Sequence, residues 1–189
     1  MQKMSKQICQ PLGMTLIELM IVIAILAIMA GMTMSALGKY IPDYRLQSAA
    51  RELYANMHKA KSEAIKRNTK CRIVFDVNNS QYAISLDGGS DDTLSTIEDN
   101  ENLKIVRLNK YKSIEYGSGK ALFDATDDKD TIPSDYVSFG YNIVTFNAHG
   151  TGNAGYVYLE NTNHKSYAIG TLPSGLVMIK KWKNGDWDL

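Results

Sequence analysis

The chain has 189 residues, of which 44% are hydrophobic and 22% are charged. Its 21 basic and 20 acidic side chains leave a formal net charge of +1, so bulk charge gives no support for a nucleic-acid-binding protein. The length allows a hydrophobic N-terminal segment and one domain of roughly 100–150 residues with its own core.

The N-terminal part combines a basic leader with a long apolar run. The leader, residues 1–13, holds two lysines and no acid, which predicts a cytoplasmic N-terminus. Between Glu18 and Lys39 no side chain is charged. A helix of about 20 residues is about 30 Å long, the thickness of the hydrocarbon core of a bilayer. Residues 14–38 are therefore predicted to form a helix that crosses a membrane or lies in the core of a larger assembly.

The segment from Gly13 to Leu19, GMTLIEL in one-letter code, resembles the class III signal of type IV prepilins and type II secretion pseudopilins. In that family a membrane aspartyl peptidase cuts after the glycine and methylates the new N-terminal amine. The resemblance implies cleavage between Gly13 and Met14 and a methyl group on Met14. The first residue after the cut is usually Phe in this family, and here it is Met. The alternative is a signal anchor that is not cleaved.

Glu18 is the one carboxylate within this apolar helix. A charge among apolar side chains is costly unless it has a partner. Cleavage after Gly13 would create a cation at Met14, four residues earlier and on the same helix face. The resemblance implies that this carboxylate faces the N-terminal amine of a neighbouring subunit. We expect such a pair to guide docking and register more than it adds net stability.

A second helical pattern follows the apolar run. Apolar residues recur at spacings of three and four from Leu46 to Ala64, and charged residues occupy the opposite face. The helix is therefore predicted to continue to about Arg67. Residues 39–67 should form its amphipathic part, with the apolar side packed against a globular domain.

Residues 68–189 are predicted to form that domain, which is rich in β-structure. No alternation of strand and helix appears, which favours an antiparallel sheet, or two sheets, packed against the helix. The predicted fold class is α+β, with a long hydrophobic N-terminal helix, pilin-like, whose C-terminal half packs against an antiparallel β-sheet or β-sandwich. The expected strands are residues 71–77, 81–86, 103–108, 136–139, 143–146, 155–160, 167–171 and 176–182.

Two further stretches resemble the minor pilins and pseudopilins of the GspH/FimT group. Residues 59–68, KAKSEAIKRN, look like the segment that follows the hydrophobic arm in that group, and residues 143–177 look like its final strands. The resemblance implies a structural subunit of a type II secretion pseudopilus or a type IV pilus, initiating or tip-proximal. Its implied partners are other pilins or pseudopilins, the prepilin peptidase and the inner-membrane assembly platform. The implied location is the bacterial inner membrane, with a single pass and a periplasmic C-terminal domain, and then the filament.

A DNA-binding alternative rests on the C-terminal strand. FimT-like members carry a Gly-Arg-x-Arg motif that contacts DNA, but the matching residues 175–178 read GLVM and lack both arginines. Lys180, Lys181 and Lys183 follow and could contact a phosphate backbone weakly. The other interpretation of these lysines is a solvated edge strand protected from aggregation.

No catalytic or cofactor site is predicted. The three histidines lack metal-ligand spacing, and Cys71 begins a strand without an evident partner base, so we expect a packed thiol and no enzyme. Two acidic loops, residues 87–92 and 124–130, could bind calcium, which prefers carboxylate and carbonyl oxygens on a flexible loop. Neither has the spacing of an EF-hand, and solvated loops are the commoner case, so no cofactor is expected.

Overall fold

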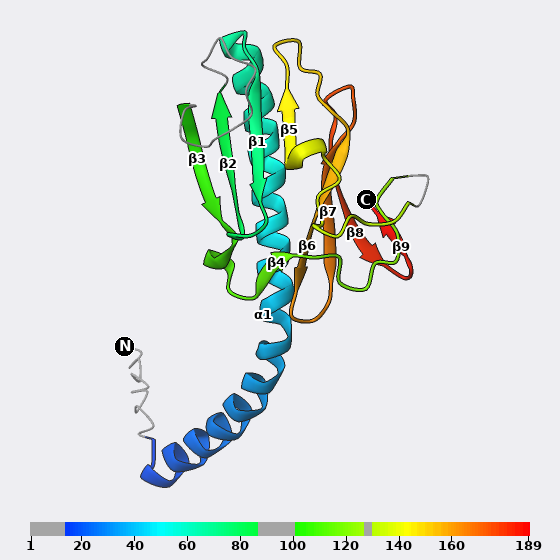
Figure 1. Ribbon diagram of the computed structural model, residues 1–189. Coiled ribbons are helices and arrows are strands. Elements are labelled where there is room, and N and C mark those ends of the chain that lie inside the picture. Colours follow the sequence, from blue (N-terminus) through cyan, green and yellow to red (C-terminus); the bar gives the residue numbers. More distant parts are fainter. Residues whose placement is uncertain (1–13, 87–100, 127–129) are drawn as a thin grey trace, which may run out of the picture. The chain divides into compact units, whose positions relative to one another are not determined.

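A computed structural model describes residues 14–86, 101–126 and 130–189 (Figure 1). The chain divides into two units, Met1–Gly38 and Lys39–Leu189. The helix α1, Leu16–Arg67, begins in the first unit and ends in the second, which confirms the single long helix expected from the sequence.

In the first unit, residues 19–29 of α1 are all apolar. Its large side chains from Leu16 to Met29 are 42–78% exposed in the isolated chain. A helix that is apolar all round is stable only where other apolar groups surround it. Within the part of the chain that the structure describes, no helix has both the length and the apolarity for crossing a membrane. The membrane span expected at residues 14–38 therefore stays a prediction.

In the second unit, α1 turns one apolar stripe toward the domain. The side chains of this stripe belong to the main hydrophobic core, together with residues of both sheets. The helix ends at Arg67, and the φ of 51° at the next residue, Asn68, allows the backbone N–H of Thr69 to reach the carbonyl oxygen of Ala64 at 3.1 Å. Each residue of the stripe is 2% exposed or less: Leu46, Ala49, Ala50, Leu53, Met57, Ala60 and Ala64.

The first sheet has the strand order β3-β2-β1-β5, and all its neighbours are antiparallel (Figure 1). The predicted hairpin is confirmed as β1 and β2, which are joined by a short turn at residues 77–80. Two short 3-10 helices, η1 and η2, flank this sheet. The bounds are β1 Cys71–Asp76, β2 Gln81–Leu86, β3 Glu101–Arg107, β5 Ile143–Phe146, η1 Leu108–Tyr111 and η2 Gly140–Asn142.

The second sheet has the order β4-β6-β7-β8-β9 and is also antiparallel throughout. Two of its strands, β4 and β9, were not expected from the sequence. Together the two sheets and α1 give the α+β fold that was predicted. The bounds are β4 Ile114–Tyr116, β6 Gly155–Asn161, β7 Ser166–Thr171, β8 Val177–Lys183 and β9 Asp186–Asp188.

The two faces of the second sheet belong to different clusters. Val157 and Leu159 of β6 join the main core with α1 and the first sheet. Tyr156 and Tyr158 point the other way, because successive side chains of a strand alternate between faces. With Ala125 they form a second buried cluster, so a long loop after β4 covers the outer face of this sheet.

The strand predicted at residues 136–139 is wrong. Tyr136 has a φ of 61°, which breaks the extended conformation, and only Val137 forms a bridge, to Val157. The backbone N–H of Ser138 donates to the carbonyl oxygen of Tyr156 at 2.8 Å. The segment thus lies beside β6 without forming a regular strand.

Candidate functional site

The start of α1 is defined by its own first residues. Thr15 precedes the helix, and its Oγ1 accepts a hydrogen bond from the backbone N–H of Glu18 at 3.3 Å. A threonine followed three residues later by glutamate is the capping-box pattern of helix N-termini. Met14 and Glu18 are both exposed in the isolated chain. Gly13, the predicted cleavage residue, lies outside the described residues.

The three candidate DNA-contacting lysines do not form one patch. Alternation along β8 places Lys180 on one face of the sheet and Lys181 and Lys183 on the other. The ammonium of Lys180 donates to the carbonyl oxygen of Ala125 at 2.7 Å and lies 5.5 Å from the ring centre of Tyr156. Lys180 therefore holds the covering loop against the sheet.

The strand β9 sets acidic residues opposite the other two lysines. Its register sets Asp188 opposite Lys181 and Asp186 opposite Lys183. Opposite charges across a strand pair attract each other, so these aspartates lower the affinity of this edge for a polyanion such as DNA. The interpretation of β8 as an edge strand is wrong, because β9 pairs with it. DNA binding through these lysines stays a prediction, and their arrangement does not favour it.

The sequence contained a signal for β9 that our prediction missed. Asn184 and Gly185 have φ values of 55° and 87°, the left-handed conformations that a tight hairpin turn of this kind requires. An Asn-Gly pair between two runs of aromatic and charged residues is a strong short-range hairpin pattern. It returns the last residues of the chain to the sheet.

The hairpin and the covering loop share an aromatic cluster. The rings of Trp182 and Trp187 lie 5.2 Å apart, and Phe123 packs on Trp182 at 5.1 Å. The indole N–H of Trp187 donates to the carbonyl oxygen of Phe123 at 2.9 Å. The hydroxyl of Tyr158 accepts from the backbone N–H of Ala125 at 2.8 Å. These contacts hold the covering loop against the sheet, so the aromatic groups have a structural role.

The acidic loops were considered as calcium sites. The first, residues 87–92, lies outside the described residues, as do residues 127–129 of the second. Asp124 is buried, and its Oδ1 accepts hydrogen bonds from the backbone N–H and the hydroxyl of Thr126. This carboxylate thus stabilises a turn. Among the residues that the structure describes, no group of three or more His, Cys, Asp or Glu side chains could hold a metal ion.

Cys71 is a packed thiol. It is fully buried in the main core as a free cysteine. Burial, and then the nearby Glu63 carboxylate, raises the pKa of Cys71 to about 11. A thiol with so high a pKa holds little thiolate at neutral pH, and thiolate is the nucleophilic form. The expectation of a structural cysteine is confirmed.

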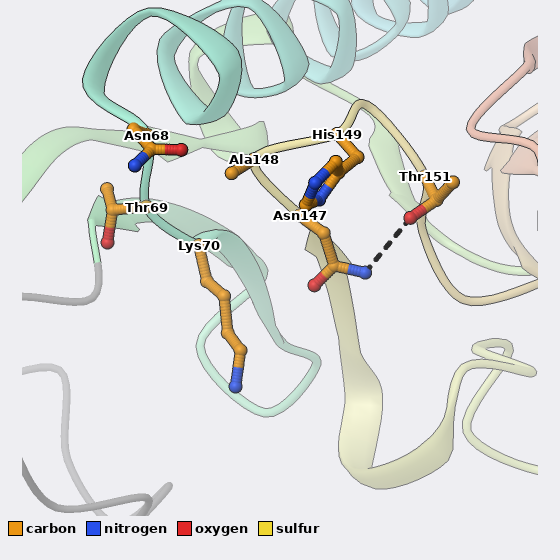
Figure 2. A pocket seen from close by; sticks show the side chains of 7 residues that line it. All are labelled: Asn68, Thr69, Lys70, Asn147, Ala148, His149 and Thr151. Carbon is orange, nitrogen blue, oxygen red and sulfur yellow. Dashed lines mark hydrogen bonds between the residues drawn. The ribbon is translucent and has the colours of Figure 1, made fainter.

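A hollow of about 650 Å³ lies where the chain leaves α1 (Figure 2). Its polar lining includes Lys70 and the exposed His149, and the amide of Asn147 donates to the hydroxyl of Thr151 at 3.2 Å. The side chains in Figure 2 come from two short stretches, residues 68–70 and 147–151. The one side-chain hydrogen bond drawn between them in Figure 2 joins Asn147 and Thr151.

Two carboxylates of α1 clamp the helix to the domain, and both were missed at the sequence level. Asp43 binds the turn between β6 and β7. Its Oδ1 accepts from the side-chain amides of Asn161 at 2.8 Å and Asn163 at 3.0 Å, and its Oδ2 pairs with Lys165. Burial alone would raise the pKa of Asp43, but these three donors outweigh it and hold the pKa below its usual value.

Glu52 forms the second clamp, to the end of the first sheet. Its Oε1 accepts from Lys104 at 3.1 Å, and its Oε2 accepts from Lys110 at 2.5 Å and from the hydroxyl of Tyr111 at 2.9 Å. Burial alone would raise the pKa of Glu52, but the donors, with Lys110 the strongest, hold it below its usual value. The two clamps fix the orientation of α1 against both sheets.

Two protein families match this chain. Residues 49–175, more than half of the sequence, match the family described as type II transport protein GspH. The chain belongs to the GspH family. Residues 12–34 match the prokaryotic N-terminal methylation motif, which confirms the prepilin-type signal. This GspH-family chain is thus a minor pseudopilin with a processing motif, a structural protein and not an enzyme, as predicted.

Solved structures and curated proteins give further comparisons. The chain is similar to the minor pseudopilin EpsH from the type 2 secretion system of Vibrio cholerae, with 9% identity, a TM-score of 0.48, and coverage of 71% of this chain and 95% of EpsH. It is also similar to the type IV minor pilin FimU of Pseudomonas aeruginosa PAO1, with 17% identity, a TM-score of 0.43, and coverage of 74% and 91%. No curated protein matches the GspH-family chain.

Proposed function

We propose that this chain is cut between Gly13 and Met14, methylated at Met14, and built into a type II secretion pseudopilus as an initiating or tip-proximal subunit. The observation that carries the proposal is the presence of two family matches on one chain, the methylation motif followed by the GspH domain. The capped start of α1 supports it, because Thr15, one residue after the proposed new N-terminus, caps the helix.

Glu18 acts in assembly through its charge. In an apolar bundle its carboxylate requires a cation, and the new amine of Met14 on a neighbouring subunit supplies one. The exposed apolar side chains of α1 in the first unit pack in the filament core, or in the inner membrane before assembly. The leader then lies in the cytoplasm and the second unit in the periplasm. The partners are other pseudopilins, the prepilin peptidase and the inner-membrane assembly platform.

Mass spectrometry of the membrane-extracted protein tests the processing step. We expect a chain that lacks residues 1–13 and begins with methylated Met14. An intact N-terminus in cells with an active prepilin peptidase would overturn this part of the proposal.

The assembly step is tested with Glu18→Ala. We expect normal cleavage but at least a tenfold loss of the variant from sheared filaments, roughly the effect of 1.4 kcal/mol or more in subunit affinity. The control is Glu63→Ala, which removes an α1 carboxylate whose ion pair among the described residues is with Arg67, on the same helix. Recovery of Glu18→Ala in filaments at the wild-type level would contradict the assigned role.

A further inference from the structure

The second unit leaves one side of α1 uncovered. Opposite the buried stripe, exposed residues recur at spacings of three and four over about seven turns of the helix. No acidic residue lies among them. We call this set the outer stripe: Tyr40, Ile41, Tyr44, Arg51, Ala55, His58, Lys59, Ser62, Ile65 and Lys66.

The charges of α1 are sorted between its two sides. Its acidic residues in the second unit all have partners within this chain: Asp43 with Lys165, Glu52 with Lys104 and Lys110, and Glu63 with Arg67. Among the described residues, no carboxylate lies within 4.0 Å of the three cations of the outer stripe, Arg51, Lys59 and Lys66. The uncovered side is therefore positively charged without internal compensation.

Large apolar side chains mark the N-terminal end of the outer stripe. Tyr40 is 68% exposed and Tyr44 is 73% exposed, with Ile41 beside them. Tyrosines on a surface combine a large apolar area with a hydrogen-bonding hydroxyl, and they are enriched at protein interfaces. Arg51 follows two turns after Tyr44 on the same side. The stripe thus has an aromatic end and a basic end.

A groove runs along the stripe, between α1 and the second sheet. It consists of two adjoining hollows of about 210 and 240 Å³ that share Gln47, Tyr167 and Lys181. The first hollow reaches Tyr44 and the second reaches Arg51. The buried Leu46 and Tyr167 give the groove an apolar floor, and the carboxylate of Asp43 in its lining is already paired with Lys165. Lys181 lies 5.7 Å from the ring centre of Tyr167, which places a cation at the rim.

We propose that the outer stripe and this groove receive a neighbouring pilin-like subunit that presents carboxylates beside an apolar side chain. The inference rests on the proposed function, because it requires a filament neighbour. A floor of apolar side chains takes up the apolar group, while Arg51 and Lys181 on the two sides of the groove pair with the carboxylates.

Charge and shape favour this partner over the alternatives. Two copies of this chain that met stripe to stripe would bring cations against cations, which opposes a symmetric dimer. A flat lipid surface would contact the stripe but leave the floor of the groove unfilled. An acidic, side-chain-bearing protein surface satisfies both features.

The test places a photo-crosslinking amino acid, p-benzoylphenylalanine, at Tyr44 in the full-length protein, in cells that hold the complete secretion apparatus. We expect one main product, with another pilin-like subunit, through a peptide that contains Asp or Glu. The double variant Arg51→Glu with Lys181→Glu should reduce this product roughly tenfold or more, because like charges then face each other. Arg51→Gln with Lys181→Gln should give an intermediate yield.

The control reverses an exposed cation on β3 of the first sheet, Arg107→Glu, and should keep the product within about twofold of wild type. Changing the crosslinked Asp or Glu of the partner to Lys should restore the product of the Arg51→Glu, Lys181→Glu variant. That rescue is the decisive support for charge pairing.

Four results would overturn the inference: a main product with lipid, with DNA, or with a second copy of this chain, or equal yields from the reversed and wild-type proteins. Failure of the proposed function differs from these results. In that case the protein would keep its leader and give no product with any pilin-like subunit, whatever the charge at residues 51 and 181.

Discussion

Replacing the clamp carboxylate Glu52 by Gln should weaken the domain measurably while keeping the shape of the side chain. The change removes the negative charge that holds Lys104, Lys110 and Tyr111 against α1. The two lysines are 40% and 43% exposed and can return to water, so each ion pair contributes only about 0–1 kcal/mol. The hydrogen bond from Tyr111 to a charged acceptor contributes about 1.5–3 kcal/mol, of which a neutral amide keeps part.

We therefore expect Glu52→Gln to lower the free energy of unfolding by about 2 kcal/mol, or Tm by about 4–8 °C. The assay is urea and thermal unfolding of the detergent-solubilised full chain, followed through the fluorescence of Trp182 and Trp187. The control is Glu63→Gln, which disrupts one ion pair with Arg67, four residues later on the helix, and should cost about 0.5 kcal/mol or less.

The pH dependence gives the sharper test. The folded-state pKa of Glu52 lies below the usual value of 4.5, so its stabilisation is fully present above that pH and is lost as pH falls through the folded-state pKa. The difference between wild type and Glu52→Gln should be constant above about pH 5.5 and shrink below about pH 4.5. Asp43 and Asp76, whose pKa values are also lowered, titrate in both proteins and cancel. Equal unfolding midpoints at neutral pH, or a difference that persists at low pH, would refute the clamp.

Two further predictions concern the packing of the domain. Cys71 should resist thiol reagents in the native protein at pH 8 and react within minutes in urea, because it is fully buried and has a pKa of about 11. Labelling is measured by the shift in protein mass, and rapid labelling of Cys71 in the native protein would contradict this prediction. Gly175→Ala should destabilise the chain by about 2 kcal/mol or more, because φ is 73° and the new Cβ would meet the carbonyl oxygen of Gly150 at 1.9 Å. Gly140→Ala, where a Cβ meets nothing within 4 Å, is its control, and equal unfolding midpoints for the two variants would disprove the steric argument.

The sequence was sufficient where a repeating pattern decides the structure. The apolar spacing from Leu46 to Ala64 predicted the buried stripe of α1 residue by residue, because a helix face repeats every 3.6 residues. The same holds for most strands, whose β-branched and aromatic runs were bounded by turn residues. The run without charged side chains after Glu18 and the GMTLIEL string were sufficient to identify the prepilin-type signal.

Prediction failed where distant parts of the chain decide the local structure. Asp43 and its partner Lys165 are 122 residues apart, and Glu52 is more than 50 residues from Lys104, so no local pattern marks either clamp. The lysines of β8 looked like one basic group, yet strand alternation places Lys180 on the opposite face from Lys181 and Lys183, and β9 sets aspartates opposite those two. The Asn184–Gly185 pair is a hairpin pattern in the sequence, and it predicts a strand after β8, where the structure has β9.

The clamp at Asp43 also determines where mechanical load enters the domain. A pull on α1 toward its N-terminus is resisted at Asp43 by three donors from a single turn, residues 161–165, which ends one strand of the five-stranded sheet and begins the next. Tension that reaches Asp43 is therefore passed to β6 and β7, two interior strands that pair with each other from Gly155 to Glu160. An extending or retracting filament could pull on this subunit without first peeling its edge strands.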